Sequence, residues 1–192
     1  IRFFSFYFIT LIMISGLALA ANYITMYLFY EMMTLFSVPL VLHSGARDAV
    51  AAAKKYLFYS IFGATLGLLG LFFVNVYGTT LNFVPGGVLD PLKVAGHENV
   101  LLGIAFLTVM GFGAKAGLFP LHSWLPAAHP VAPAPASALL SGVITKAGVL
   151  CIFRVIYYIF GIEFLKGTWV QLAWITLALV TVFLGSMMAY NE

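Results

Sequence analysis

Three charged residues lie deep inside long apolar runs of this sequence. Glu31 is near the middle of NYITMYLFYEMMTLFSVPLVL, Lys115 is well inside NVLLGIAFLTVMGFGAKAGLFPLHSWLP, and Lys146 is in the middle of ASALLSGVITKAGVLCIFRVIYYIF. Each charge at the centre of a bilayer costs about 2.5–3.5 kcal/mol on insertion scales. Carboxylates and amines retained at that depth exchange protons or bind cations, so this pattern indicates a proton- or sodium-translocating path.

Lys55 is a fourth candidate, because it lies about one turn inside another apolar run, AAAKKYLFYS. Two alternatives stay open. Lys54, Lys55 and Arg154 would reach the interface with their long side chains, and Glu31 would pair with a lysine only to hold helices together. The deeper lysines are about ten or more residues from a run end, too far to reach water, since a helix rises about 1.5 Å per residue.

The run around Lys115 also contains a helix breaker, Pro120, which removes one amide donor and clashes with the carbonyl four residues earlier. Broken helices at membrane depth are typical of transport sites. A simple kink is the alternative, but it would not explain a lysine one turn away. His122 follows the break and is either a proton relay or a hydrogen-bonding wedge, and Trp124 fits an interfacial anchor.

Membrane-spanning helices must position these side chains. Only 8% of the 192 residues are charged and 63% are hydrophobic, whereas soluble domains are about 25% charged. Backbone groups in lipid must be satisfied within the chain, which favours helices. We predict an all-α integral membrane protein with about six spans, one of them broken, over roughly residues 3–21, 22–42, 52–77, 100–125, 136–160 and 168–189.

The connections and the remaining charges exclude other classes. The four prolines of LPAAHPVAPAP (125–135) forbid a helix through that loop. The nine Lys and Arg residues are scattered, with no basic run for nucleic acid. The single Cys151 excludes an intrachain disulfide and fits packing. Arg2, Arg47 and the lysine pair fall on one side, which the positive-inside rule places in the cytoplasm.

The segment 111–154 carries recognisable motifs. GFGAKAGLFPLHSWLPAAHPVAPAPASALLSGVITKAGVLCIFR has a lysine before a Gly-x-x-Pro break, a PLHxWLPxAHP segment, a Pro-x-Ser-Ala-Leu helix start and a lysine before a small-Gly pair. This pattern resembles the antiporter-like membrane subunits of respiratory complex I, multisubunit Na+/H+ antiporters and membrane-bound hydrogenases. YEMMTLFSVPLVL and AAAKKYLFYS resemble the glutamate- and lysine-bearing helices of that family.

The resemblance implies a role for each candidate residue. Glu31 would be the charge-pair glutamate and Lys55 its partner. Lys115 would be the central lysine of the broken helix, Lys146 the lysine leading toward the neighbouring half-channel, and His122 the histidine after the break. As a hypothesis, Glu31 moving toward Lys55 stabilises Lys115 less, so that Lys115 releases its proton toward Lys146 and later reloads from the cytoplasmic side.

The resemblance also implies an architecture. Residues 1–167 would form one inverted five-helix repeat that translocates ions, and 168–192 the first helix of a second, truncated repeat. Both ends of the sequence fit a fragment of a longer chain. Ala127 departs from the family pattern, because family members usually have an acidic residue at this position. The AHP…SALLSG sequence is more similar to hydrogenase- and antiporter-type members.

The implied function is translocation of H+ or Na+ by a subunit of a redox-driven pump or multisubunit antiporter in a bacterial or archaeal cell membrane. We expect no cofactor in this chain, which has no CxxC, GxGxxG or metal cluster. Iron-sulfur or other redox centres would belong to partner membrane subunits. Two other classes stay open: a haem- or quinone-binding redox subunit, and a structural membrane scaffold.

Overall fold

The computed structural model describes residues 2–191. That part of the chain has no named strand, only two isolated β-bridges. Six helical stretches are long and apolar enough to cross a membrane, which confirms the all-α prediction. They are α1 (Arg2–Leu19), α2 (Tyr23–Val41), α3 (Arg47–Tyr77), α5 (Glu98–Ala116), a composite stretch over Ala134–Phe160, and α10 (Trp169–Asn191).

The composite stretch and the connections contain the remaining elements. The stretch alternates α-helix with two π-helical segments, which often mark functional sites. It consists of α7 (Ala134–Leu139), η1 (Leu140–Ile144), α8 (Thr145–Arg154) and η2 (Val155–Phe160). The connections hold three short helices, α4 (Pro91–Val94), α6 (Leu125–Ala128) and α9 (Ile162–Leu165).

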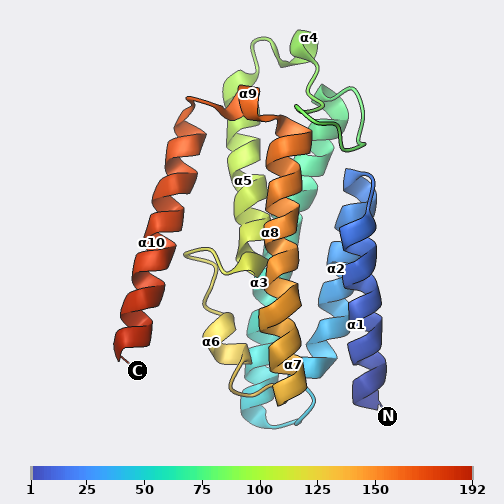
Figure 1. The fold of residues 1–192 in the computed structure, drawn as a ribbon, viewed down its shortest axis with the longest axis vertical. Coiled ribbons are helices and arrows are strands. Elements are labelled where there is room, and N and C mark those ends of the chain that lie inside the picture. The colour runs from blue at the N-terminus through green and yellow to red at the C-terminus, as the bar shows by residue number, and fades with distance from the viewer. Residues whose placement is uncertain (1, 192) are drawn as a thin grey trace.

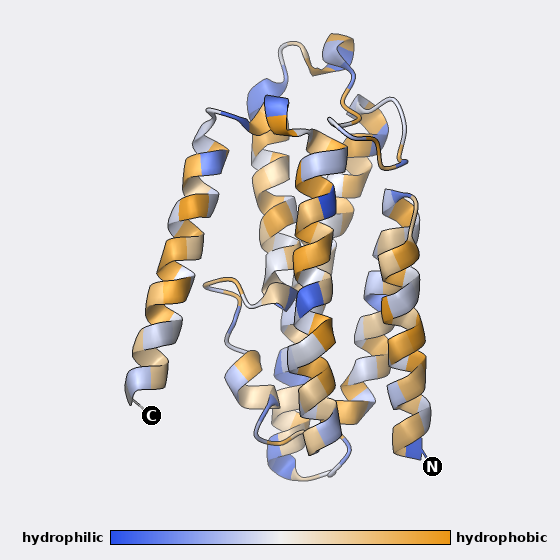
Figure 2. Ribbon diagram, viewed as in Figure 1, coloured by the Kyte–Doolittle hydropathy of each residue, from blue (hydrophilic) through white to orange (hydrophobic). Residues whose placement is uncertain are grey.

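Five spans form a bundle, and the sixth stands at its edge (Figure 1). In the bundle α1 packs on α2, α2 on α3, α3 on α5, and α5 on α8. Helix α10 contacts α5 only sparsely. Val170 at its start is buried, but no residue of 171–190 is. Hydrophilic residues gather toward the ends of the bundle, and the middle is mostly apolar (Figure 2).

Glycines allow α3 and α5 to approach closely. Gly63 and Gly67 form a G-x-x-x-G pair on α3, and a β-carbon at Gly63 would collide with the carbonyl oxygen of Gly111 on α5. On the other side of α5, a β-carbon at Gly148 would lie 2.8 Å from the amide nitrogen of Ala116. Membrane helices associate through such small residues, so the glycines fix the position of α5 inside the bundle.

Two predicted boundaries are wrong. Helix α3 begins at Arg47, not at residue 52, with Asp48 in its first turn, where a carboxylate favours the helix N-terminus. Helix α5 ends at Ala116, not at residue 125. As predicted, no helix runs through the whole proline-rich connection 125–135. It contains the four-residue helix α6, with Pro126 in the first turn, where a missing amide costs nothing.

Candidate functional site

The break in the fourth span lies directly after Lys115. Gly117 ends α5 in the left-handed conformation with φ 90°, and its amide bonds to the carbonyl of Gly113. The segment 117–124 then leaves the helix at mid-height of the bundle before α6 begins (Figure 1). Glycine rather than Pro120 therefore ends the helix. Lys115 lies in the last turn of α5, where the unpaired carbonyls favour a positive charge.

The Lys115 side chain is fully buried between α2 and α3. Its Nζ donates a hydrogen bond to Oγ1 of Thr34 on α2. The same nitrogen lies 4.6 Å from the ring centroid of Tyr30 and 5.6 Å from that of Tyr56. An ammonium over aromatic faces gains a cation–π attraction, so one hydroxyl and two rings replace the water that the charge has lost.

A second layer of contacts fixes these partners. The Tyr56 hydroxyl and Ser37 Oγ lie 2.7 Å apart, and Ser37 Oγ donates to the carbonyl of Thr34 at 2.9 Å. The Tyr56 ring centroid lies 4.8 Å from that of Trp124, which is fully buried. Trp124 Nε1 donates to the carbonyl of Ala114 at 2.8 Å. Trp124 is therefore part of the pocket, and the prediction of an interfacial anchor is wrong.

Glu31 lies on the same helix as the lysine's hydroxyl partner. Its side chain is half-buried, and its Oε1 accepts a hydrogen bond from the Tyr27 hydroxyl at 2.9 Å. Glu31 precedes Thr34 by three residues, so the two are neighbours on the helix surface. Lys55 is exposed on α3, and among the described residues no ion pair or hydrogen bond joins it to Glu31.

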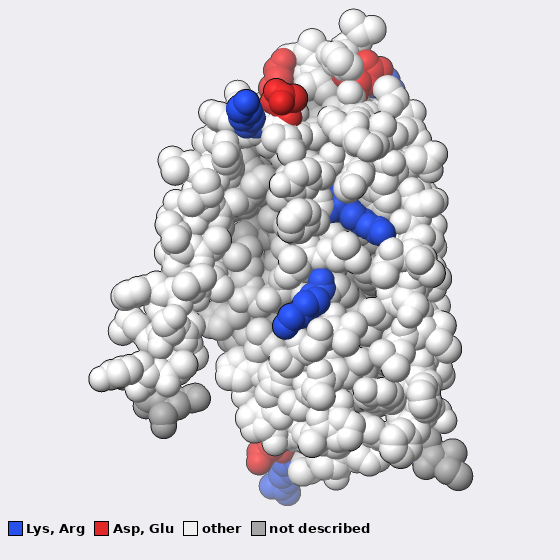
Figure 3. Space-filling view, in the orientation of Figure 1, with Lys and Arg blue, Asp and Glu red and all other residues white. Residues whose placement is uncertain are grey.

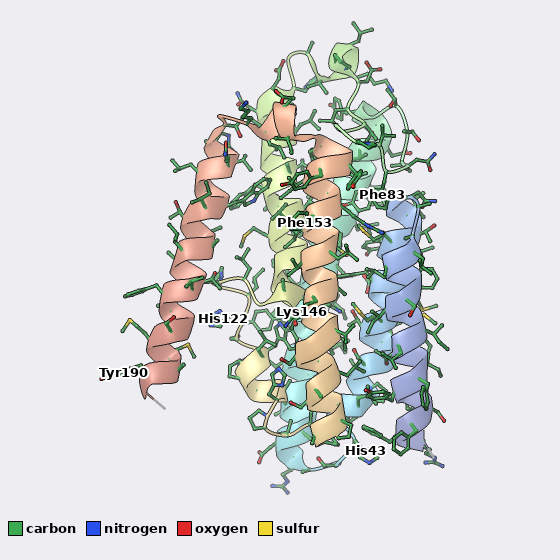
Figure 4. The ribbon with its side chains drawn as sticks, viewed as in Figure 1. His43, Phe83, His122, Lys146, Phe153 and Tyr190 are labelled. Atoms are coloured by element: carbon green, nitrogen blue, oxygen red, sulfur yellow. The ribbon has the colours of Figure 1, made fainter. Side chains whose placement is uncertain are left out.

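Lys146 has a different environment. Figure 4 shows it at mid-height on the composite span, and its side chain is exposed. Its Nζ donates to the carbonyl of Ser141 at 2.7 Å, and that oxygen also accepts from Thr145 Oγ1 at 2.8 Å. Ser141 lies in the π-helical segment η1. Figure 3 shows basic side chains in an otherwise uncharged middle of this face.

His122 lies in the broken segment, on the side facing α10 (Figure 4). It is half-buried, and its ring centroid is 5.8 Å from that of Phe119. Its Nδ1 is buried and has no hydrogen-bond partner within the described residues. The amide of Phe119 donates to Thr181 Oγ1 on α10 at 3.0 Å, so the broken segment touches the sixth span.

Arg154 contacts another helix and does not simply reach the interface. Its Nη1 donates to the carbonyls of Leu17 at 3.0 Å and Ala20 at 2.9 Å, and its Nη2 to that of Ala18 at 2.6 Å. The guanidinium also lies 5.0 Å from the Phe83 ring centroid. Arg154 therefore satisfies the carbonyl end of α1, as basic side chains do at helix C-termini.

Sequence reasoning missed most of the pocket. The hydroxyl and aromatic side chains around Lys115 were not among the candidates, although one signal was present: polar side chains recur every third residue on α2. The missed residues are Tyr30, Thr34, Ser37, Tyr56 and Trp124.

The described residues contain no group of three His, Cys, Asp or Glu side chains placed to hold a metal. The four histidines are dispersed. His43 follows α2, His97 immediately precedes α5, His122 lies in the break, and His129 follows α6.

The fold and the site define a multi-pass integral membrane protein with a broken helix and a buried lysine at the break. The chain belongs to the NADH:quinone oxidoreductase/Mrp antiporter transmembrane family, whose model matches residues 20–192. This confirms the family resemblance carried by the 111–154 motifs.

Relatives come from several kinds of complex. The chain is 31% identical over 147 residues to an Na(+)/H(+) antiporter subunit of Bacillus subtilis (77% of this chain, 29% of the relative). It is 34% identical over 167 residues to Hydrogenase-4 component B of Escherichia coli (85% and 23%). These two identities are close, so they do not separate an antiporter type from a hydrogenase type.

A solved structure has the same fold. The membrane-bound sulfane sulfur reductase, an archaeal respiratory membrane complex, contains a chain that matches with a TM-score of 0.67 and 22% identity, over 78% of this chain and 30% of that one. The chain described here thus spans about a quarter to a third of the length of the relatives it matches.

Proposed function

We propose that this chain carries protons or sodium ions across the membrane as the translocating part of a subunit of a larger complex. One observation carries the proposal: Lys115 is fully buried at the broken end of α5, with a hydroxyl and two aromatic rings as its partners. Burial disfavours the charged form of an amine, while hydrogen bonds and nearby negative charge favour it, so a lysine in this environment is suited to gain and lose a proton.

The other candidate residues would help Lys115 to gain and release its proton. Glu31 biases the charge on Lys115, and Lys146 receives the proton on the far side of α5. Lys55 remains the proposed alternative partner of Glu31, and His122 the relay after the break. Water molecules complete the path, since no continuous series of hydrogen bonds joins these side chains within the described residues.

The larger assembly is part of the proposal. Relatives are named as subunits of antiporters and hydrogenases, so we propose partner membrane subunits, with any redox centres in those partners. Residues 1–167 would act as one translocating repeat and 168–192 as the start of the next. A bacterial or archaeal cell membrane fits the relatives.

The test is ion uptake by inverted vesicles that contain the intact complex. We expect Lys115→Ala to lower uptake by roughly a hundredfold, the scale of a lost acid–base group, and Glu31→Gln to lower it less. Lys166→Ala is the matched control, because Lys166 is exposed between α9 and α10, and uptake should not change. Undiminished uptake in both Lys115→Ala and Glu31→Gln would instead support the scaffold hypothesis.

A further inference from the structure

Trp124 lies where the broken segment meets the Lys115 pocket. Its indole donates to the carbonyl of Ala114, the residue before Lys115, at 2.8 Å. Its ring packs on that of Tyr56, with centroids 4.8 Å apart. Trp124 therefore contacts both the backbone beside the lysine and one of the rings that face the ammonium, although it is the last residue of the broken segment 117–124.

Tyr56 is held from two sides. Its hydroxyl is hydrogen-bonded to Ser37 on α2, and its ring contacts both Trp124 and the Lys115 ammonium. The cation–π attraction exists only while Lys115 is protonated. When the proton leaves, Tyr56 loses one of its contacts and keeps those with Ser37 and Trp124. The balance of forces on Trp124 therefore depends on the charge of the lysine.

We propose that Tyr56 and Trp124 couple the protonation state of Lys115 to the position of the segment 117–124. Both are positioning residues, and the inference rests on the proposed function of Lys115 as a proton carrier. The segment carries His122, whose Nδ1 is buried without a partner among the described residues. A small displacement of Trp124 changes what this nitrogen can contact. Protonation of Lys115 and the hydrogen bonding of His122, the proposed relay, therefore become linked.

Other ionisable groups face the same lysine and belong to the coupling. They come from α2, α3 and α8, and they are Glu31, Tyr30, Tyr56 and Cys151. Glu31 is the carboxylate among them, so we expect its removal to shift the pH response of the pocket. The position of Trp124 should shift with pH in the same way, because Trp124 responds to the charge on Lys115 and not directly to pH.

The first test measures Trp124 directly in the intact complex. The protein is labelled with 5-fluorotryptophan, and the ¹⁹F resonance of Trp124 is assigned by its disappearance in Trp124→Phe. We expect this resonance to shift with pH through one inflection that is absent in Lys115→Met and displaced in Glu31→Gln. A resonance that does not respond to pH in the wild type, or an unchanged inflection in Lys115→Met, would overturn the proposal.

The second test measures coupling. Trp124→Phe keeps an aromatic ring beside Tyr56 but removes the donor to Ala114, and Tyr56→Phe removes only the hydroxyl that bonds Ser37. We expect a several-fold fall in ions moved per turnover and a displaced pH profile for both, whereas Trp169→Phe, at an exposed position on α10, leaves both unchanged. Wild-type values in both pocket variants would contradict the coupling even if Lys115→Ala abolishes uptake, which separates this inference from the proposed function.

Discussion

Two lysines lie in the apolar middle of this bundle, and their surroundings differ. Lys115 is fully buried and contacts side chains of α2 and α3. Lys146 is exposed and bonds to a carbonyl of its own span. A lysine at membrane depth therefore does not by itself define a site. The partners of Lys115 described above all belong to this chain. We expect the partners of Lys146 to come from a neighbouring subunit that packs against this face of α8 in the proposed complex.

Among changes to the surroundings of the two lysines, the largest expected effect concerns their hydroxyl neighbours. Thr34→Val removes the acceptor for the Lys115 ammonium, and a hydrogen bond to a charged group contributes about 1.5–3 kcal/mol, so ion uptake should fall roughly tenfold or more. Thr145→Val is the matched change near Lys146, where the Ser141 carbonyl keeps its bond from the lysine. Uptake assays on vesicles compare the two, and equal losses would remove the distinction between the regions.

Glycines provide the next comparison. A β-carbon at Gly148 would lie 2.8 Å from the amide nitrogen of Ala116 and 2.9 Å from the carbonyl oxygen of Phe112, whereas at Gly142, near Lys146, it would meet nothing within 4 Å. Gly148→Ala should therefore destabilise the fold by about 1–3 kcal/mol. Gly142→Ala should be neutral or stabilising by up to about 1 kcal/mol. Thermal unfolding in detergent measures both, and a stable Gly148→Ala would mean that α5 and α8 pack less tightly than described.

The smallest effect concerns His129, which lies outside both lysine regions and the membrane spans. Its Nδ1 is 2.7 Å from Ser137 Oγ, and burial lowers the pKa of this histidine. The unfolded chain therefore binds a proton more readily, so the histidine's contribution to stability is present above its ordinary pKa of about 6.5 and is lost on acidification.

His129→Gln should remove this part of the pH dependence of thermal unfolding. His43→Gln, at an exposed position after α2, is the control and should keep it. If acid destabilises wild type and His129→Gln equally, the pH dependence comes from other groups. The groups around Lys115 and Lys146 would then be tested next.

The spans and the site's centre were predictable from the sequence because both depend on local patterns. Long apolar runs define the helices, and a lysine followed by glycine and proline marks the break. The exact start of α3 was not predictable, because Arg47 and Asp48 are too polar for a membrane-spanning run. They nevertheless suit the first turn of a helix.

The partners of the lysine depend on contacts between distant parts of the chain. Thr34 and Lys115 are 81 residues apart, and serine or threonine in a membrane helix commonly bonds its own backbone, as Thr34 also does to Tyr30. No local pattern reveals the second contact. In the same way, the pairing of Glu31 with Lys55 stays a prediction, because the structure gives Glu31 a hydrogen bond from Tyr27 in its own helix.

The bonds of Arg154 to the end of α1 have a consequence for how the protein is made. They join residues 134 to 137 positions apart. As the chain emerges from the ribosome, α1 enters the membrane well before α8 exists, and its final carbonyls wait for their guanidinium. The α1–α2 hairpin therefore gains this contact only after α8 has been synthesised, so formation of the contact belongs to a late step in assembly of the bundle.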